Sequence, residues 1–152
     1  MMTELKRIDQ LDMATVEKLV GESEAEGYRF LRRLVDEYES GKNTFKASGE
    51  VLYGVWNEEG QLIAVGGLNR DRFSDDDRTG RLRRFYVSEN ARRQGIGSQL
   101  LNAIVKHARS SFDVLVLRTD SESADGFYFA NGFTREAAKP EVTHRLVMKE
   151  QS

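Results

Sequence analysis

The chain has 152 residues and a formal net charge of −2, a length that suits a single domain, residues 1–152, around one hydrophobic core. It contains no cysteine, so disulfide frameworks and thiolate chemistry are excluded. No apolar run is long enough to span a bilayer and the first residues lack the apolar stretch of a secretory signal, so we expect a cytoplasmic protein that does not act on membranes.

The first half of the chain has the pattern of two helices followed by a β-hairpin. Apolar residues recur at helical spacing in two segments, and Asp12 is a typical N-cap for the first of them. Two strand-like runs then flank the turn sequence Asn57–Gly60. The expected elements are a strand at 3–9, helices at 11–27 and 28–40, strands at 50–56 and 61–68, and a polar loop at 69–80.

In the second half, strands and helices alternate, which predicts a βαβ unit and hence an α/β fold with a mixed sheet. The expected elements are strands at 81–87, 113–119 and 142–148, a helix from Ile96 and a short helix at 124–132. The longer helix has one apolar stripe, formed by Ile96, Leu100, Leu101, Ile104, Val105 and Ala108. The continuous apolar run at 113–119 is typical of a strand buried on both faces.

The stretch Arg92–Gly97, with the sequence RRQGIG, places two glycines at the start of this well-patterned helix. A glycine inside a helix costs about 1 kcal/mol relative to alanine, so Gly95 and Gly97 need another reason. The first turn of a helix presents unpaired backbone N–H groups and a partial positive charge, which together bind anions. Because glycine has no Cβ, a ligand can approach its backbone closely. The stretch therefore predicts a cradle for a phosphate or pyrophosphate.

Two other phosphate-binding motifs do not fit this stretch. A Walker A loop needs Lys and Ser/Thr after its last glycine, whereas Gly97 is followed by Ser98 and Gln99. A dinucleotide fingerprint needs a third glycine, and this position is Leu100. The pattern Arg/Gln-x-x-Gly-x-Gly/Ala between a strand and a helix fits at every defined position.

Charge is unevenly distributed along the chain. Residues 1–76 carry a net charge of −6 and residues 77–152 a net charge of +4. Six arginines lie within or shortly before the glycine-rich stretch: Arg78, Arg81, Arg83, Arg84, Arg92 and Arg93. Such a positive field favours an anionic ligand. The alternative is a solvated basic face.

The glycine-rich stretch and its surroundings resemble the GNAT superfamily of acyl-CoA-dependent acetyltransferases. The strand LRRFYV precedes the motif, and the strand DVLVLRT follows its helix. The segment ADGFYFANGF matches the family signature Ala-x-x-Phe-Tyr-x-x-x-Gly-Phe, through Ala124, Phe127, Tyr128, Gly132 and Phe133, and VTHRL resembles the ending of some bacterial members. The resemblance extends over residues 48–150. It implies a GNAT-type fold, with a mostly antiparallel sheet that splays between the CoA-binding strand and the parallel strand after it, and helices on both faces.

The resemblance also implies where acetyl-CoA would bind, without a metal. Its pyrophosphate would lie on the backbone N–H groups from Arg93 to Ser98, and its pantetheine arm would run like an additional strand along the preceding strand. The residues so implied are Phe85, Tyr86, Val87, Arg92, Arg93, Gln94, Gly95, Ile96, Gly97 and Ser98. Many members carry Asn seven residues before the signature tyrosine, where this chain has Ser121, so the contact of Ser121 with the cofactor stays open.

The implied reaction is attack of an amine on the thioester carbonyl. A backbone N–H near Phe85 or Tyr86 would stabilise the carbonyl oxygen. Tyr128 would protonate the leaving thiolate, which its ordinary pKa near 10 allows, unless it is an aromatic core residue. The amine's proton would go to His144, unless that histidine packs within the last strand and an ordered water accepts the proton. His107 is expected on the surface.

The acceptor pocket is expected between the N-terminal helices and the splayed strands. Glu22, Glu24 and Glu26 lie in the predicted connection between those helices, where they form either an acidic rim that favours a cationic amine or a solvated loop. The aromatic residues that line either this pocket or the core are Tyr28, Tyr53 and Trp56.

The sequence thus favours an N-acetyltransferase that moves an acetyl group from acetyl-CoA to a primary amine of a small molecule or peptide. The alternative is a non-catalytic module of the same fold that senses acyl-CoA, against which the presence of Tyr128 argues. Nucleic-acid binding is disfavoured by the net acidity and by the lack of aromatic residues interleaved with exposed basic ones. A homodimer is left open.

Overall fold

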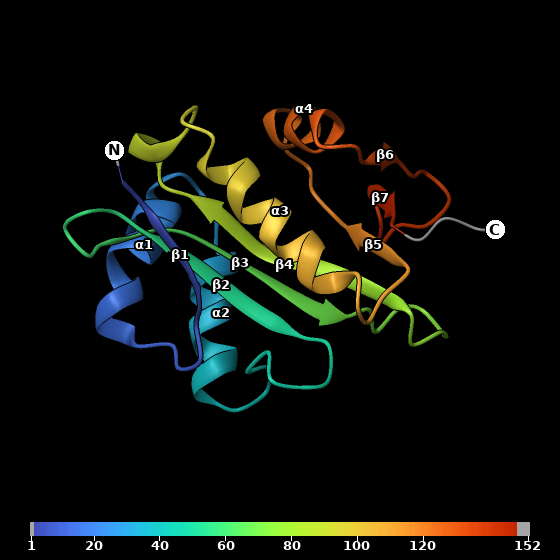
Figure 1. Ribbon diagram of the computed structural model, residues 1–152, viewed down its shortest axis with the longest axis horizontal. Coiled ribbons are helices and arrows are strands. Elements are labelled where there is room, and N and C mark those ends of the chain that lie inside the picture. Colours follow the sequence, from blue (N-terminus) through green and yellow to red (C-terminus); the bar gives the residue numbers. More distant parts are fainter. Residues whose placement is uncertain (1, 149–152) are drawn as a thin grey trace.

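The computed structural model describes residues 2–148, which form a seven-stranded sheet with helices on both faces (Figure 1). The strands are β1 (Glu4–Arg7), β2 (Val51–Trp56), β3 (Leu62–Arg70), β4 (Thr79–Val87), β5 (Val114–Leu117), β6 (Thr134–Arg135) and β7 (His144–Val147). The helices are α1 (Met13–Ala25), α2 (Phe30–Glu39), α3 (Ile96–Ala108) and α4 (Glu122–Ala130), with a 3-10 turn at Glu89–Ala91.

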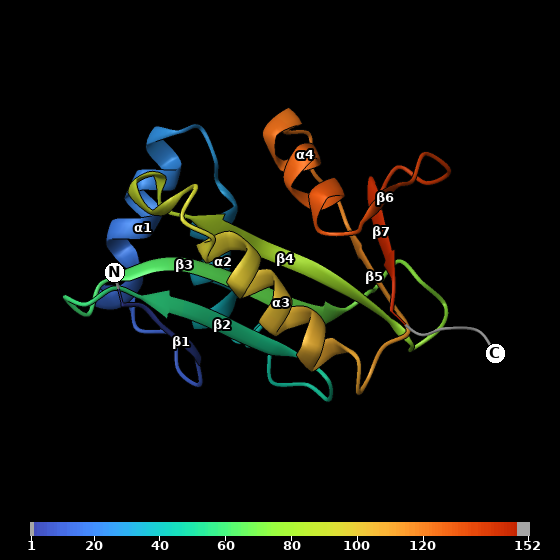
Figure 2. The same ribbon diagram turned by 45° about the horizontal axis from the view of Figure 1, so that its top comes forward.

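The strands follow the order β1-β2-β3-β4-β5-β7-β6, and every pairing is antiparallel except that of β4 with β5. The parallel pair arises because α3 connects β4 to β5 as a crossover. Helices α1 and α2 cover one face of the sheet, and α3 crosses the other (Figures 1 and 2). The predicted mixed sheet of mostly antiparallel strands is confirmed.

Each face of the sheet has its own apolar core. On one face, the predicted stripe of α3 is buried at Ile96, Leu100, Leu101, Ile104 and Ala108. Val105 is only half-buried, at the margin of this core. On the other face, the buried residues of the two N-terminal helices include Val16, Leu19, Val20, Leu31, Leu34 and Val35. The helical periodicity therefore identified the core-facing side of α3 correctly.

Several boundaries differ from the prediction because pairing between strands overrides local polarity. The loop expected at 69–80 is too long, since β3 continues to Arg70 and β4 already begins at Thr79. The second helix begins at Phe30, two residues later than expected. The last strand is confined to His144–Val147 and pairs with the two-residue strand β6, which the sequence pattern did not predict.

Strand β4 contains a β-bulge opposite Gly66 of β3. The register between the strands shifts there, so that Arg84 and Phe85 together oppose this glycine. Arg84 has a φ of 58°, a left-handed conformation that is uncommon for residues other than glycine. A Cβ on Gly66 would lie 2.8 Å from the ring of Phe85, so the glycine makes room for that ring.

Strands β4 and β5 pair over three residues and then diverge. Their register runs from Thr79 with Val114 to Arg81 with Val116, and no pairing follows within the described residues. Strand β5 pairs with β7 on its other side. The edge of β4 over residues 82–87 that faces β5 is therefore without a strand partner, and Figure 2 shows the two strands diverging toward α4.

Gly67→Ala is expected to destabilise the protein by about 1–3 kcal/mol, because a Cβ there would lie 2.4 Å from the buried ring of Phe45. Gly21→Ala in α1 is the matched control, since an added Cβ there meets nothing within 4 Å and alanine favours the helix by about 1 kcal/mol. Urea denaturation measures the free energy of unfolding of both variants. Equal stability of Gly67→Ala and the parent protein would contradict this packing.

Candidate functional site

The connection from β4 to α3 forms a concave row of backbone N–H groups. Arg93 and Gly95 both adopt the left-handed conformation, with φ of 65° and 80°, and Gly95 is the N-cap of α3. Such residues turn neighbouring N–H groups toward one side, which makes an anion-binding nest. The amides at 93–95 have no acceptor within residues 2–148, and those at 96–98 belong to the unpaired first turn of the helix. The geometry of this cradle, residues 93–98, fits an anion.

The two glycines of the cradle have different structural reasons. A Cβ at Gly95 would meet nothing within 4 Å, so the left-handed φ selects glycine there rather than lack of space. A Cβ at Gly97 would lie 3.2 Å from the ring of Phe127 in α4. The sequence attributed both glycines to the close approach of a ligand, but Gly97 also lets α4 pack against the start of α3.

Four of the six arginines near the motif pair with carboxylates. The nitrogen–oxygen distances are 2.9 Å for Arg78–Asp113, 2.8 Å for Arg81–Asp71, 2.6 Å for Arg84–Glu37 and 2.6 Å for Arg92–Glu26. Arg83 and Arg93 form no ion pair in the part of the chain that the structure describes, although Glu37 lies near Arg83 and interacts with its charge. The predicted positive field is thus largely neutralised, and the two unpaired guanidinium groups lie on β4 and in the cradle.

Arg92 contacts α1 and β4. Its Nε donates to the carbonyl oxygen of Val87 at 3.0 Å, and its terminal nitrogens lie 2.9 and 2.6 Å from the Glu26 carboxylate. Its guanidinium also stacks 5.4 Å from the ring centroid of Tyr86. The family resemblance implied that Arg92 lies beside the pyrophosphate. In the structure its contacts instead connect the cradle to the end of α1.

Carboxylates at the end of α1 form a hydrogen-bonded cluster with β4. The Tyr86 hydroxyl lies 2.9 Å from Glu22 and also contacts Glu26, while Glu24 pairs with α2. Arg92, and then Tyr86, lower the pKa of Glu26. Burial, and then the two carboxylates, raise the pKa of Tyr86. The expected connection is therefore mostly helix, because α1 extends to Ala25 and Glu26 is its C-cap, and Glu22 and Glu26 hold this end of the helix to the sheet instead of forming a free rim.

Tyr128 lies in α4 at the centre of an aromatic cluster. Its ring centroid is 5.2–6.1 Å from those of Phe85, Phe127, Phe133 and His144. The residue is 6% exposed, and this burial raises the pKa of Tyr128. Its hydroxyl has no hydrogen-bond partner within the described residues. Tyr128 is therefore protonated at neutral pH, with a hydroxyl available to donate.

His144 is buried in β7 and is held through both ring nitrogens. Its Nδ1 lies 2.8 Å from Oγ1 of Thr143, and its Nε2 lies 2.7 Å from Oδ1 of Asp125. Asp125 also pairs with Arg135, and Arg135 first and His144 second hold the pKa of Asp125 well below its ordinary value. His144 thus joins β7 to α4, in agreement with the alternative that it packs within the last strand.

Two further polar residues have structural partners. Ser121 is the N-cap of α4, and its Oγ accepts a hydrogen bond from the Ala124 amide at 3.2 Å. The prediction that His107 is a surface residue is wrong. This residue of α3 is half-buried, and its ring lies 6.1 Å from that of Tyr53 in β2. This burial lowers the pKa of His107.

Of the three aromatic residues considered for the acceptor pocket, Tyr28 lies near β4. It is 39% exposed, and its ring is 5.5 Å from that of Phe30, which in turn lies 6.1 Å from Tyr86. Tyr53 and Trp56 belong to β2, which β3 separates from β4, and they pack against the two cores.

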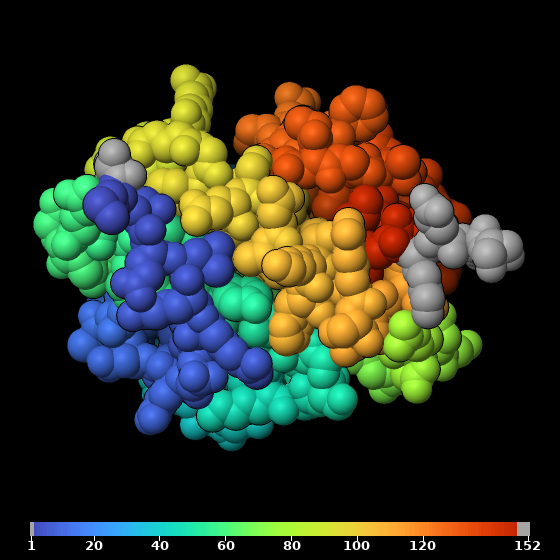
Figure 3. All heavy atoms as spheres, in the orientation of Figure 1, coloured from blue at the N-terminus to red at the C-terminus, as the bar shows by residue number. Residues whose placement is uncertain are grey.

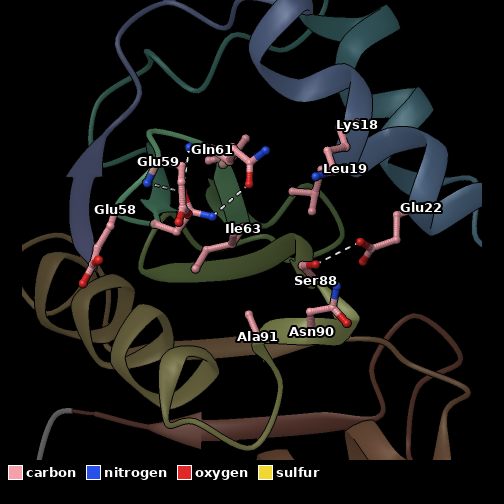
Figure 4. A pocket seen from close by; sticks show the side chains of 12 residues that line it. Lys18, Leu19, Glu22, Glu58, Glu59, Gln61, Ile63, Ser88, Asn90 and Ala91 are labelled. Carbon is pink, nitrogen blue, oxygen red and sulfur yellow. Dashed lines mark hydrogen bonds between the residues drawn. The ribbon is translucent and has the colours of Figure 1, made fainter. Parts of the chain in front are cut away.

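A cavity of about 390 Å³ lies beside α1 (Figure 4). Its walls come from α1, the β2–β3 hairpin and residues 88–91, and a hydrogen bond from Ser88 to Glu22 crosses one side. Glu22, a candidate for the rim of the acceptor pocket, lines it, whereas the residues predicted to bind the cofactor or to take part in catalysis do not. A separate hollow lies between the segment that precedes α3 and α4, as Figure 3 shows.

Comparison with protein families agrees with this geometry. The family model described as "Acetyltransferase (GNAT) family" matches residues 14–133. The chain belongs to the GNAT acetyltransferase family. Members of this family use acyl-CoA, for which the cradle and the unpaired edge of β4 are suited. No curated protein sequence matches the chain.

Solved structures of similar fold come from several bacteria. A candidate acetyltransferase from Exiguobacterium sp. 255-15 shares 32% identity over 97% of this chain and 94% of that chain, with a TM-score of 0.86. A GNAT family acetyltransferase from Staphylococcus aureus Mu50 shares 18% identity over 97% and 100%, with a TM-score of 0.77. An acetyltransferase from Streptococcus agalactiae 2603 shares 17% over 96% and 98%, with a TM-score of 0.76. At identities of 18% and 17%, the Staphylococcus and Streptococcus structures show that they share the fold of this chain.

Within residues 2–148, no helix is both long and apolar enough to cross a membrane. The same residues contain no group of three or more His, Cys, Asp or Glu side chains arranged to hold a metal ion.

Asp125→Asn is expected to destabilise the protein at neutral pH, because it removes the carboxylate that Arg135 and His144 share. Since those partners lower the pKa of Asp125, the carboxylate stabilises the fold above the ordinary aspartate pKa of about 4, and this contribution is lost as the pH falls. The stability difference between parent and variant should therefore shrink from about pH 7 toward about pH 2 in urea denaturation. Glu24→Gln, in an exposed pair, is the control and should change stability little. A difference that stays constant with pH would argue against this role of the carboxylate.

Proposed function

We propose that the chain transfers an acetyl group from acetyl-CoA to a primary amine of a small molecule or peptide. The observation that carries this proposal is the unpaired edge of β4 over residues 82–87, which leads into the cradle at 93–98. A pantetheine arm contains amide groups that can hydrogen-bond to such an edge like an added strand, and its pyrophosphate is an anion of the kind that the cradle takes. Both features therefore fit one extended cosubstrate.

Backbone groups of β4 and of the cradle would hold acyl-CoA. Phe85, Tyr86 and Val87 offer their main chain, and the Val87 carbonyl keeps a second lone pair beside its bond from Arg92. The cradle residues are Arg93, Gln94, Gly95, Ile96, Gly97 and Ser98. The exposed, unpaired guanidinium of Arg93 adds positive charge there. When bound, acyl-CoA supplies the thioester from which the acyl group is transferred.

The reaction forms a bond between the acceptor nitrogen and the acyl carbon and breaks the carbon–sulfur bond. Because Arg84 and Phe85 both oppose one residue of β3, a backbone N–H group at the bulge lies outside the regular hydrogen-bond ladder between the two strands. This group can donate a hydrogen bond to the acyl oxygen as negative charge develops there. Tyr128, kept neutral by burial, is suited to donate its proton to the departing sulfur.

The acceptor amine must also lose a proton. His144 and an ordered water are the two candidates for accepting it. A general base must reach the proton that it removes, and both nitrogens of His144 are already held by groups of the protein, Thr143 and Asp125. This favours water as the proton acceptor, with His144 as a positioning residue whose ring lies 5.8 Å from that of Tyr128.

Gly95→Glu is expected to weaken CoA binding by about 10-fold or more, because it places a carboxylate among the N–H groups of the cradle. Gly95→Ala is the matched control, since it has the same strained left-handed φ without the charge and should bind nearly as tightly. Isothermal titration calorimetry with CoA measures both affinities. If the folded glutamate variant bound CoA as tightly as the parent protein, the cradle would not be the pyrophosphate site.

Tyr128→Phe is expected to keep CoA affinity and to lower the acyl-transfer rate about 10²-fold, because it removes the proton donor and little else. Tyr53→Phe on β2 is the control and should retain the parent rate, since that ring packs in the core. Thiol release measured with an amine in excess gives the rates. Parental turnover by Tyr128→Phe, with chemistry as the slow step, would remove Tyr128 from the mechanism.

A further inference from the structure

Three arginines of β4 lie on the face that α1 and α2 cover, next to the bulge, and a fourth lies near them in the connection between β3 and β4. This arginine cluster consists of Arg72, Arg81, Arg83 and Arg84. Among the described residues, Asp71 pairs with Arg81 and Glu37 with Arg84. Arg72 and Arg83 form no ion pair there, although Glu37 also lies near Arg83, so the four arginines face only two carboxylates and the cluster holds more positive than negative charge.

Nitrogens in the arginine cluster lack hydrogen-bond acceptors. Nε of Arg84 and Nη2 of Arg81 are buried without a partner, and each of these side chains is only 10% exposed. Arg83 is half-buried and unpaired, and burial, together with the neighbouring Arg84, lowers its pKa. Buried donors without acceptors are costly and uncommon in folded proteins. An anion at this place would accept their hydrogen bonds and reduce the repulsion between the guanidinium groups.

The arginine cluster borders the place where the acceptor amine would react. Arg84 is the left-handed residue of the bulge, and the next residue, Phe85, lies on the edge of β4 proposed to receive the pantetheine arm. Arg83 directly precedes the bulge. An acceptor that approaches from the side of α1 and α2 therefore meets the unpaired guanidinium of Arg83 beside the reacting carbonyl.

We propose that Arg83, with Arg84 beside it, binds a carboxylate of the acceptor, so that the preferred acceptors are amino acids acylated on the α-amine. This inference rests on the proposed acyl transfer. A guanidinium holds a carboxylate through two parallel hydrogen bonds, which fixes its orientation. In the same cluster, Arg84 holds Glu37 through a single contact of 2.6 Å, which leaves Nε of Arg84 without an acceptor. In an α-amino acid the amine is separated from the carboxylate by a single carbon, so anchoring the carboxylate at Arg83 keeps the amine beside the bulge.

Matched acceptors test this site directly. Each of a panel of amino acids is compared with its primary amide and with the corresponding decarboxylated amine, and thiol release from acetyl-CoA gives kcat/KM. Amino acids should be preferred about 10- to 100-fold over both comparison compounds, which keep the amine but lack the carboxylate, as expected for hydrogen bonds to a charged group. Phosphoethanolamine is included because a phosphate would satisfy the same guanidinium groups.

Variants of Arg83 locate the effect. Arg83→Gln should lower kcat/KM for amino acids about 10- to 100-fold and leave the amides within about 2-fold, because only the carboxylate loses its partner. Arg83→Lys should recover part of the preference, since it keeps the charge without the paired geometry. Arg109→Gln, at an exposed position after α3, is the matched control and should behave like the parent protein. Unchanged CoA affinity in calorimetry shows that the Arg83 variants are folded.

The outcomes separate this inference from the proposed function. Acetylation of amides or decarboxylated amines as fast as of amino acids, or a preference that survives Arg83→Gln, overturns the carboxylate site and leaves the acyl transfer standing. Faster acetylation of phosphoethanolamine than of any amino acid assigns the arginine cluster to a phosphate and also overturns it. If CoA binds but no amine of either class releases thiol, the proposed function fails, and the inference fails with it.

Discussion

The extra residue in β4 gives the two sides of this strand different chemistry. Because Arg84 and Phe85 both oppose Gly66, the side chain of Arg84 joins Arg83 on the face covered by α1 and α2. Phe85 lies on the other face, against the aromatic cluster of Tyr128. A regular strand would alternate and could not present two consecutive arginines on one face. The bulge therefore separates a charged surface, suited to an acceptor, from an apolar one that holds the proposed proton donor.

The uneven charge of the sequence has a structural counterpart in the packing of the N-terminal helices on the sheet. Carboxylates from the first half of the chain, Glu26 and Glu37, pair with Arg92 and Arg84 from the second half. Exposed ion pairs contribute little to stability, but the Arg84 pair is largely buried, and losing one partner would leave an uncompensated charge. These pairs hold the N-terminal helices against the sheet, and together with the pairs of Arg78 and Arg81 they neutralise four of the six arginines near the motif, which makes Arg83 and Arg93 distinctive.

The position of the aromatic cluster around Tyr128 depends on the ion pairs of Asp125, which lies in the same helix. Asp125 at the start of α4 is shared by Arg135 of β6 and His144 of β7, so the helix that carries Tyr128 is fixed to the far end of the sheet. Ser121 caps the same helix. The tyrosine is thereby buried without a partner for its hydroxyl in the described chain, which keeps it neutral and able to donate a proton.

The sequence by itself determined the features that depend on near neighbours in the chain. Periodicity predicted the core stripe of α3, and the two glycines pointed to the start of that helix, because an amphipathic pattern and the glycines that interrupt it are local properties. Only the tertiary structure decided which arginines are paired, since their carboxylates come from residues far away in the sequence, as with Arg84 and Glu37. The bulge was likewise hidden, because it is a register shift between β3 and β4 and leaves no period in either strand alone. The burial of His144 and its contact with Asp125 required the pairing of β7 with β5, a non-local arrangement that no spacing within the last strand encodes.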